Sequence, residues 1–313
     1  MSQHNPSILY VGLDVSKFSL DLHLAGEFHN LSNDPHGHAQ LLKLLKPYPQ
    51  AHLICEATGG YEQAAVRALQ AANLPVSILE ASRVRYFARA QGLRAKTDRI
   101  DAAVLTEYGH TFQPAPLAAP TPQQQQLAEL SQRRRQLVEM KVLERNHLEH
   151  YADTFRKRQA RQLIGALEKQ IAACEQAIQT LIDQDAQLTH KAERLKAIPG
   201  VGPVVAATML AEMPELGTLN PQTAAALAGV APYNRDSGKH TGVRCISGGR
   251  STVRCALYMA TLNAMRRDRI LKEFYQRLLA AGKKPLVAMT AVMRKLIVLM
   301  NRLLKNPKFQ LAN

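Results

Sequence analysis

Two short apolar runs in the first hundred residues each end in a carboxylate, and they constrain the fold more than any other feature. Residues 8–13 (Ile-Leu-Tyr-Val-Gly-Leu) lead into Asp14, and residues 52–55 (His-Leu-Ile-Cys) lead into Glu56. Short runs of β-forming residues followed by small or polar residues are typical of buried strands. Because ligand sites of α/β sheets lie outside the carboxyl ends of their strands, these acids predict a site at one edge of a sheet.

A second pair of acids, Asp98 and Asp101, is spaced three residues apart and would share one face of a helix. Carboxylates placed in this way repel each other, so the pair needs a positive partner, either an arginine or a metal ion. Taken singly, each acid is more simply a turn or helix-cap residue, or part of a solvated first helical turn. Together with Asp14 and Glu56, the pair predicts a site for a hard cation, Mg²⁺ or Mn²⁺.

The pattern of the first 112 residues predicts a mixed α/β sheet flanked by helices. We expect strands at residues 9–14, 19–24, 27–31, 53–56 and 76–79, and helices at residues 38–45, 61–72, 81–91 and 98–108. A hairpin meander followed by βαβ units gives a mixed sheet. This order, with an acid on the first strand, resembles the ribonuclease H-like fold.

The charge of the chain indicates which kind of partner it binds. Lys and Arg total 40 against 25 Asp and Glu, giving a net charge of +15, which indicates a polyanionic partner such as nucleic acid.

The four cysteines lack Cys-x-x-Cys spacing and indicate reduced thiols. The chain starts without a signal-peptide pattern, and Arg294 and Lys295 interrupt its most apolar late segment. We expect a cytoplasmic protein with no membrane partner. His147 and His150 have no further partners for a zinc site.

The middle of the chain predicts a helical hairpin. Residues 113–123 contain four prolines and read as a linker, and residues 124–196 are polar and helical. The seam has coiled-coil spacing and consists of Ile164, Leu167, Ile171, Cys174, Ile178 and Leu181. This seam can pack against the preceding helix of the same chain or pair two subunits. The basic runs at residues 133–135 and 156–158 are either solvated faces or phosphate contacts.

The last third of the chain predicts a mostly α-helical domain that opens with a helix-hairpin-helix. Gly200 and Gly202 form a tight turn between two apolar helices, where backbone N–H groups can bind a DNA phosphate. A plain αα-hairpin is the alternative. The loop of residues 234–244 mixes glycine, serine and basic residues, a composition suited to a phosphate-facing surface and a reactive hydroxyl.

Several motifs resemble one family of bacterial insertion-sequence transposases, the IS one-ten family. Its amino-terminal Asp-Glu-Asp-Asp domain, of the RuvC-like type, is matched by residues 12–17 (Gly-Leu-Asp-Val-Ser-Lys), 55–61 (Cys-Glu-Ala-Thr-Gly-Gly-Tyr) and 92–102. Its second domain is matched by residues 198–202, 227–229, 247–250 and 254–259. The likeness covers nearly the whole chain in the right order. It divides the chain into a catalytic domain (1–112), a linker with a coiled coil (113–194) and a carboxy-terminal domain (195–313).

The resemblance implies a DNA transposase or recombinase. In this family the four acids hold Mg²⁺, and a serine that corresponds by position to Ser237 attacks the DNA phosphate to form a covalent phosphoserine. The resemblance also implies a structured bridge RNA that pairs with donor and target DNA, and homodimers that join into tetramers. Arg244, Arg250 and Arg254 are expected to contact nucleic acid, although packing of the last two against acidic residues is an alternative. Ser247 and Ser251 are expected to cap or precede a helix.

Other functions fit parts of the same pattern. A metal-dependent Holliday-junction resolvase or nuclease would use the same acids with water as nucleophile, which would leave Ser237 without a role. A site-specific DNA invertase of the same superfamily would share the chemistry on a different arrangement of substrate. A non-catalytic nucleic-acid-binding protein would use the basic regions alone, but clustered acids beside a polyanion would then serve no purpose.

Overall fold

The computed structural model describes residues 8–93, 97–234, 236–238 and 242–311. The chain divides into two compact units, Met1–Ala119 and Pro120–Asn313, and each is described by itself. Among the described residues, no helix is both long enough and apolar enough to cross a membrane.

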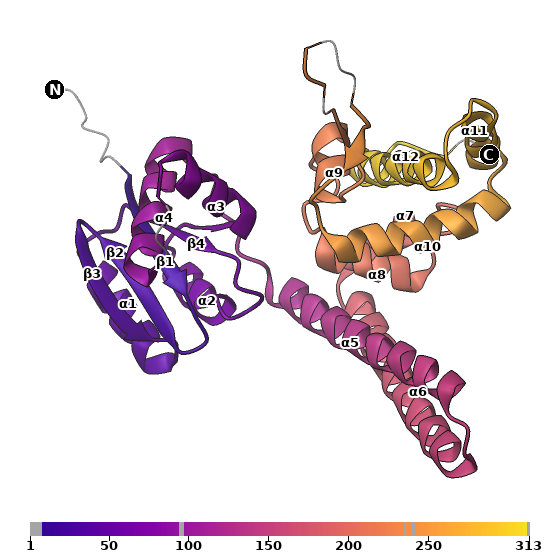
Figure 1. The fold of residues 1–313 in the computed structure, drawn as a ribbon, viewed down its shortest axis with the longest axis horizontal. Helices are drawn as coiled ribbons and strands as arrows, with labels where there is room; N and C mark the ends of the chain where they lie inside the picture. The colour runs from indigo at the N-terminus through magenta and orange to yellow at the C-terminus, as the bar shows by residue number, and fades with distance from the viewer. Residues whose placement is uncertain (1–7, 94–96, 235, 239–241, 312–313) are drawn as a thin grey trace. The chain divides into compact units, whose positions relative to one another are not determined.

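The first unit contains a five-stranded mixed sheet in the order β3-β2-β1-β4-β5 (Figure 1). The strands are β1 (Leu9–Val15), β2 (Ser19–Leu24), β3 (Glu27–Ser32), β4 (Ala51–Glu56) and β5 (Val76–Leu79). β1, β2 and β3 form an antiparallel meander, whereas β4 and β5 run parallel to β1. This confirms the predicted mixed sheet of the ribonuclease H-like type.

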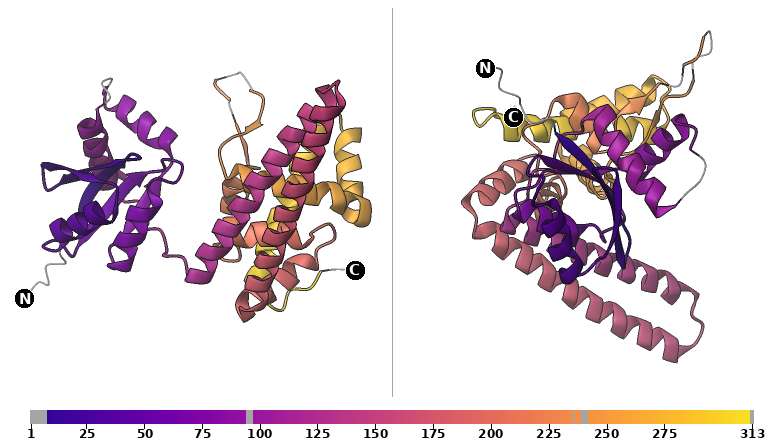
Figure 2. Two further views of the ribbon diagram at one scale, coloured as in Figure 1. Left: turned by 90° about the horizontal axis from the view of Figure 1, so that it is seen from below. Right: turned by 90° about the vertical axis from the view of Figure 1, so that its left-hand side faces the viewer.

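Helices cover both faces of this sheet (Figure 2). α1 (Pro35–Leu45) and α2 (Gln63–Ala71) pack on the face formed by the alternate leucines of β2 and their neighbours. α3 (Ala81–Ala90) and α4 (Asp98–Phe112) pack on the other face. Because side chains alternate along a strand, the residues of β1 divide between the two faces, and Asp14 falls on the face that α4 covers.

Part of the proline-rich segment belongs to the first unit. The Leu117 N–H donates to the Val76 carbonyl oxygen at 2.7 Å. The buried Ser77 hydroxyl donates to the Ala115 carbonyl oxygen at 2.8 Å. The first half of the predicted linker is therefore bound along β5, which is an edge strand of the sheet.

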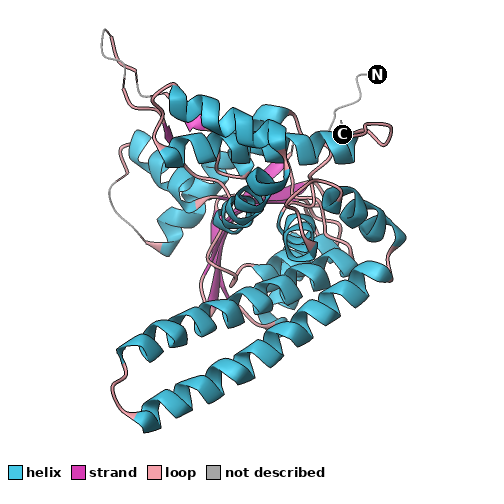
Figure 3. Ribbon diagram, turned by 90° about the vertical axis from the view of Figure 1, so that its right-hand side faces the viewer, coloured by secondary structure: helices cyan, strands magenta, loops and turns pink. Residues whose placement is uncertain are grey.

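The second unit begins with a long antiparallel helical hairpin (Figure 3). Its arms are α5 (Pro122–His150) and α6 (Thr154–Asp183), and Leu167 and Ile171 of the seam pack against Leu137 of α5. A 2.6 Å ion pair between Arg134 and Glu175 also joins the arms. This part of the seam packs against the preceding helix of the same chain, as the first of the two predicted arrangements has it.

The remaining helices build the main core of the second unit. They are α7 (Ala186–Lys196), α8 (Pro203–Glu212), α9 (Pro221–Leu227), α10 (Ser251–Arg267), α11 (Arg269–Ala280) and α12 (Pro285–Lys305). Two short strands, β6 (Pro232–Tyr233) and β7 (Cys245–Ile246), pair antiparallel at the base of the glycine-rich and serine-rich loop. The expected mostly α-helical carboxy-terminal region is thus confirmed, and the small hairpin is an addition to it.

Candidate metal centre

Strand register brings the first two acids to the same edge of the sheet. β1 and β4 are parallel neighbours, and Leu13 is the register partner of Cys55. Asp14 and Glu56 each follow one residue later, so they leave the carboxyl ends of adjacent strands on the same face. The two apolar runs therefore form adjacent strands, and the acids that end them lie at one edge of the sheet, as predicted.

The first turn of α4 supplies the other two acids. The Thr97 hydroxyl oxygen accepts a hydrogen bond from the Ile100 N–H at 3.3 Å, and this cap starts the helix at Asp98. Carboxylate oxygens of Asp14, Asp98 and Asp101 all lie within 4.8 Å of one another. Three of the four predicted acids thus form one cluster, and Glu56 stands on the strand next to it.

A glycine allows α4 to approach β1 closely enough to form this cluster. A Cβ at Gly12 would overlap the carbonyl oxygen of Ala102 in α4. The Gly12 N–H donates to the Thr106 hydroxyl at 2.8 Å, and that hydroxyl lies 2.8 Å from Nδ1 of His23. Gly12 and Thr106 therefore fix the height of α4 above the strand, and with it the distance from Asp98 and Asp101 to Asp14.

Burial and the clustered charges together raise the pKa of Asp14 to about 6 from its ordinary value of 3.8. Burial is the largest cause, followed by repulsion from Asp101, Glu56 and Asp98, with a smaller effect from Asp21. A divalent cation would relieve this repulsion, and carboxylate oxygens are the ligands that hard cations prefer. The donor set therefore fits a divalent metal, with Asp14, Asp98 and Asp101 as the group that can hold one ion.

Sequence reasoning missed residues that shape this edge of the sheet. Glu62 is 7% exposed, and its carboxylate accepts hydrogen bonds from the Thr58 hydroxyl at 2.6 Å and the Gly60 N–H at 2.9 Å. These bonds hold the loop that follows Glu56. Gly12 did carry a signal, since a glycine inside an apolar strand often marks a close approach of another backbone. Glu62 carried no local signal, because its partners are backbone and hydroxyl groups of a turn.

The predicted nucleophile lies in the loop between β6 and β7. Ser237 is exposed, and the neighbouring Asp236 accepts a hydrogen bond from the Gly242 N–H at 3.0 Å. Arg235 and residues 239–241 of this loop lie outside the described residues. Ser247 and Ser251 are exposed as well, and they precede and open α10 without capping it, because Arg250 is the N-cap residue and makes no side-chain cap bond.

The three predicted phosphate-binding arginines differ in their surroundings. Arg244 is exposed. Arg250 makes a 2.7 Å ion pair with Glu215 and donates to the Glu212 carbonyl oxygen at 2.7 Å. Arg254 donates to the Gly248 carbonyl oxygen at 2.9 Å. Arg250 thus packs against an acid, as the alternative predicts, whereas the partner of Arg254 is a backbone carbonyl oxygen. The nucleic-acid role of all three stays a prediction.

The glycines of the predicted helix-hairpin-helix lie in the turn between α7 and α8. Gly200 has a φ of +89°, and a Cβ there would overlap backbone atoms of Ala264 in α10. Gly200 is therefore needed for helix packing in any case. Gly202 is the N-cap residue of α8, and as a glycine it has no side chain to cap the helix. The phosphate-binding role of this turn stays a prediction.

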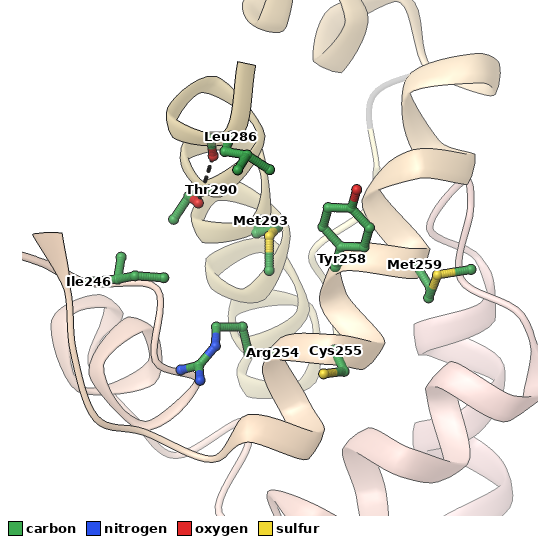
Figure 4. Close-up of a pocket in the computed structure, with 8 residues that line it drawn as sticks. All are labelled: Ile246, Arg254, Cys255, Tyr258, Met259, Leu286, Thr290 and Met293. Atoms are coloured by element: carbon green, nitrogen blue, oxygen red, sulfur yellow. Dashed lines mark hydrogen bonds between the residues drawn. The ribbon is translucent and has the colours of Figure 1, made fainter. Parts of the chain in front are cut away.

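A shallow groove lies between α10, α12 and the end of β7 (Figure 4). Its lining consists of Ile246, Arg254, Cys255, Tyr258, Met259, Leu286, Thr290 and Met293. The lining is mostly apolar, and its polar side-chain groups belong to Arg254, Tyr258 and Thr290. The Thr290 hydroxyl already donates to the Leu286 carbonyl oxygen at 2.8 Å. The groove thus lacks the carboxylates that the acid cluster offers to a hard cation.

Two family models match the chain. The model described as "Transposase IS116/IS110/IS902 family" matches residues 192–276. A second model, for the DEDD transposase of IS110, is described as "Transposase" and matches residues 11–156. The second match includes all four acids, and the first includes Ser237 and the arginines.

Similar proteins and structures are also known. The chain is 26% identical over 303 residues to the pilin gene-inverting proteins of Moraxella bovis and Moraxella lacunata, covering 93% of this chain and 94% of each relative. A structure of T. thermophilus RuvC in complex with a Holliday junction substrate is 15% identical, with a TM-score of 0.27, and covers 34% of this chain and 99% of RuvC.

Proposed function

Because the chain belongs to the IS116/IS110/IS902 family of transposases, we propose that it is an insertion-sequence recombinase that cleaves and rejoins DNA through a phosphoserine at Ser237. The family consists of enzymes that act on DNA, and the acid cluster at the sheet edge supports metal-dependent chemistry here. The observation that carries the proposal is the convergence of Asp14, Asp98 and Asp101, because a protein that only binds a polyanion gains nothing from clustered acids.

The proposed metal is Mg²⁺, with Mn²⁺ as a substitute. Asp14, Asp98 and Asp101 would hold it, and Glu56 would complete the carboxylate set from the adjacent strand. Bound divalent ions supply electrostatic stabilisation of the charge that develops on the phosphate oxygens. The protein's own contribution is a set of carboxylates fixed by a strand end and a capped helix, so the ligands are positioned before DNA binds.

The proposed covalent step exchanges one phosphorus–oxygen bond for another. The Ser237 Oγ loses its proton and forms a bond to phosphorus, while the bond from phosphorus to one DNA oxygen breaks and that oxygen takes a proton. Attack by the hydroxyl of the other strand reverses the exchange and releases Ser237. The number of phosphoester bonds is conserved, so rejoining needs no external energy source. An exposed serine in a loop of glycines and basic residues supports this role.

DNA and RNA are the proposed partners. The net charge of +15 supports binding to polyanions, and Gly200, Gly202, Arg244, Arg250 and Arg254 are the proposed contacts in the second unit. A bridge RNA that pairs with donor and target DNA, and assembly of dimers into tetramers, are carried over from the family resemblance as part of the proposal.

Site-specific DNA inversion is a second candidate, because the Moraxella relatives are named as pilin gene-inverting proteins and match nearly the whole chain. Inversion needs the same acids and the same serine as transposition. The two functions differ in the products formed from a plasmid with paired sites, since inversion retains the intervening segment and transposition moves it.

Covalent capture tests the proposed mechanism. The purified protein is incubated with Mg²⁺, RNA transcribed from the flanks of its own element and labelled junction DNA, and then denatured. We expect a protein–DNA adduct in the wild type and in Ser247→Ala, and none in Ser237→Ala or Asp14→Ala. Ser247 is the matched control because it is also an exposed serine of the second unit. Cleavage by Ser237→Ala without an adduct would instead identify a nuclease that uses water.

A further inference from the structure

Two large aromatic side chains are exposed on the loops that flank the acid cluster. Phe18 is 76% exposed and lies in the turn between β1 and β2, four residues after Asp14. Tyr61 is 50% exposed and lies in the loop after β4, five residues after Glu56. Within the described part of the chain, Nζ of the neighbouring Lys17 lies 4.9 Å from the centroid of the Phe18 ring. Core packing therefore does not explain either aromatic residue.

A single side chain ties these two loops together. Asn33 leaves the end of β3, and its side-chain amide donates to the Ser16 carbonyl oxygen at 2.8 Å and to the Tyr61 carbonyl oxygen at 3.1 Å. Its backbone N–H donates to the Phe18 carbonyl oxygen at 2.9 Å. Nε2 of His38, on α1, lies 2.9 Å from the Asn33 Oδ1 and so holds the amide in place. The backbones that carry Phe18 and Tyr61 thus share one anchor.

Each loop is also braced within itself. The Ser16 hydroxyl accepts a hydrogen bond from the Ser19 N–H at 2.9 Å, which closes the turn under Phe18. The buried carboxylate of Glu62 binds the Gly60 N–H on the residue before Tyr61. Exposed aromatic rings on braced backbone lose little conformational entropy when they bind a flat partner.

From this geometry we propose that Phe18 and Tyr61 form a stacking site for an unpaired base of the DNA strand next to the scissile phosphate. The inference rests on the proposed function, which places that phosphate at the acid cluster. A nucleotide held there would extend its neighbouring bases over the rim of the site, where these two loops lie. Lys17 adds a positive charge at the same turn for the adjacent phosphate.

The chemistry favours an unpaired base over a paired one. Bases within a duplex are already stacked and do not offer their faces to a side chain, whereas an unstacked base can pack on an aromatic ring. Stacking is tolerant of sequence because every base has an aromatic face. The site would therefore hold the strand open beside the cleavage position without selecting a sequence.

The test compares two oligonucleotides that have the same phosphates but differ in their bases. Affinities for a labelled single strand of thymidines and for an abasic strand of equal length are measured in EDTA with the full-length protein. We expect Phe18→Ala and Tyr61→Ala each to weaken binding of the thymidine strand roughly five- to one-hundred-fold. Binding of the abasic strand should stay unchanged, and Phe18→Trp and Tyr61→Phe should retain the affinity of the wild type.

Phe155→Ala is the matched control, because Phe155 is 58% exposed and lies on α6 in the second unit. Equal loss of affinity for both strands would overturn the proposal by indicating a phosphate or folding defect, and so would unchanged affinity for both. Affinity lost for duplex DNA as strongly as for the thymidine strand would also overturn it. Since binding is measured without a catalytic metal, failure of covalent capture bears on the proposed mechanism and leaves this result intact.

Discussion

At the scale of single residues, Asp14 combines a cost in stability with a proposed role as a metal ligand. Burial and four neighbouring acids raise its pKa to about 6, so an ionised Asp14 is less stable in the folded protein than in the unfolded chain. The folded state therefore binds more protons than the unfolded state between pH 3.8 and about 6. Without metal, the contribution of Asp14 to stability is present at low pH and is lost as the pH rises through this window.

We expect Asp14→Asn to raise the thermal stability of the metal-free protein at pH 7.5, because the substitution removes an unfavourable charge. At pH 4 the difference from the wild type should nearly vanish. Addition of Mn²⁺ at pH 7.5 should raise the melting temperature of the wild type and leave Asp14→Asn almost unchanged. Differential scanning calorimetry in EDTA and in Mn²⁺ measures all of these effects.

Asp236→Asn is the matched control for this experiment, since Asp236 is an exposed acid of the second unit. It should respond to Mn²⁺ as the wild type does. A melting temperature for Asp14→Asn below that of the wild type at pH 7.5 in EDTA would contradict the repulsion inferred for the acid cluster.

The sequence carries local signals for the four acids, but it carries none for most of the residues that place them. Asp14 and Glu56 follow apolar runs, and Asp98 and Asp101 have helical spacing, so each has a local signal. Thr106 contacts Gly12 from 94 residues away, and no local pattern marks that hydrogen bond. Glu62 likewise acts through a buried carboxylate whose partners appear only when the loop is folded.

At the scale of elements, the site depends on how closely α4 packs against β1. Gly12→Ala would place a methyl group against the Ala102 carbonyl oxygen, which is backbone and cannot turn away. We expect α4 to shift outward, with a loss of about 1–3 kcal/mol of stability as for other overpacked sites. Because Asp98 and Asp101 move with the helix, metal affinity should fall as well. Chemical denaturation and Mn²⁺ titration measure the two losses.

Gly165→Ala provides the comparison, because nothing lies within 4 Å of a Cβ at this position in α6. It should stabilise the protein by about 0.5–1 kcal/mol, as replacement of a helical glycine usually does. Full metal affinity in Gly12→Ala would show that the acid cluster does not depend on the close contact between α4 and β1.

The predicted ends of helices and strands differ from the observed ones where contacts outside the local sequence pattern decide the boundary. α4 was expected to end at residue 108 and continues to Phe112, since Phe112 still packs on the ring of Tyr108 at 4.7 Å. α2 begins at Gln63, later than predicted, because the side chain of Glu62 is used to close the preceding turn. β6 and β7 are too short to give a period, and they were missed for that reason.

At the scale of the whole molecule, the two units have separate cores. The clusters around the sheet contain residues of the first unit alone, and those around the helices contain residues of the second. The chain passes from one unit to the other through the proline-rich segment. That segment was expected to be a linker from residue 113, but its bonds to Val76 and Ser77 make residues 114–117 part of the first unit.

This arrangement predicts where the first unit can be cut. A fragment of residues 1–119 should fold alone and bind Mn²⁺, because its core and its carboxylates are complete. A fragment of residues 1–112 should be less stable by about 1–3 kcal/mol, since the buried Ser77 hydroxyl and the edge of β5 lose their partners. Urea denaturation of both fragments measures the difference. With Ser77→Ala in both fragments the difference should narrow, because one of the lost bonds is then absent from each. Equal stability of the two unsubstituted fragments would mean that residues 113–119 are a linker after all.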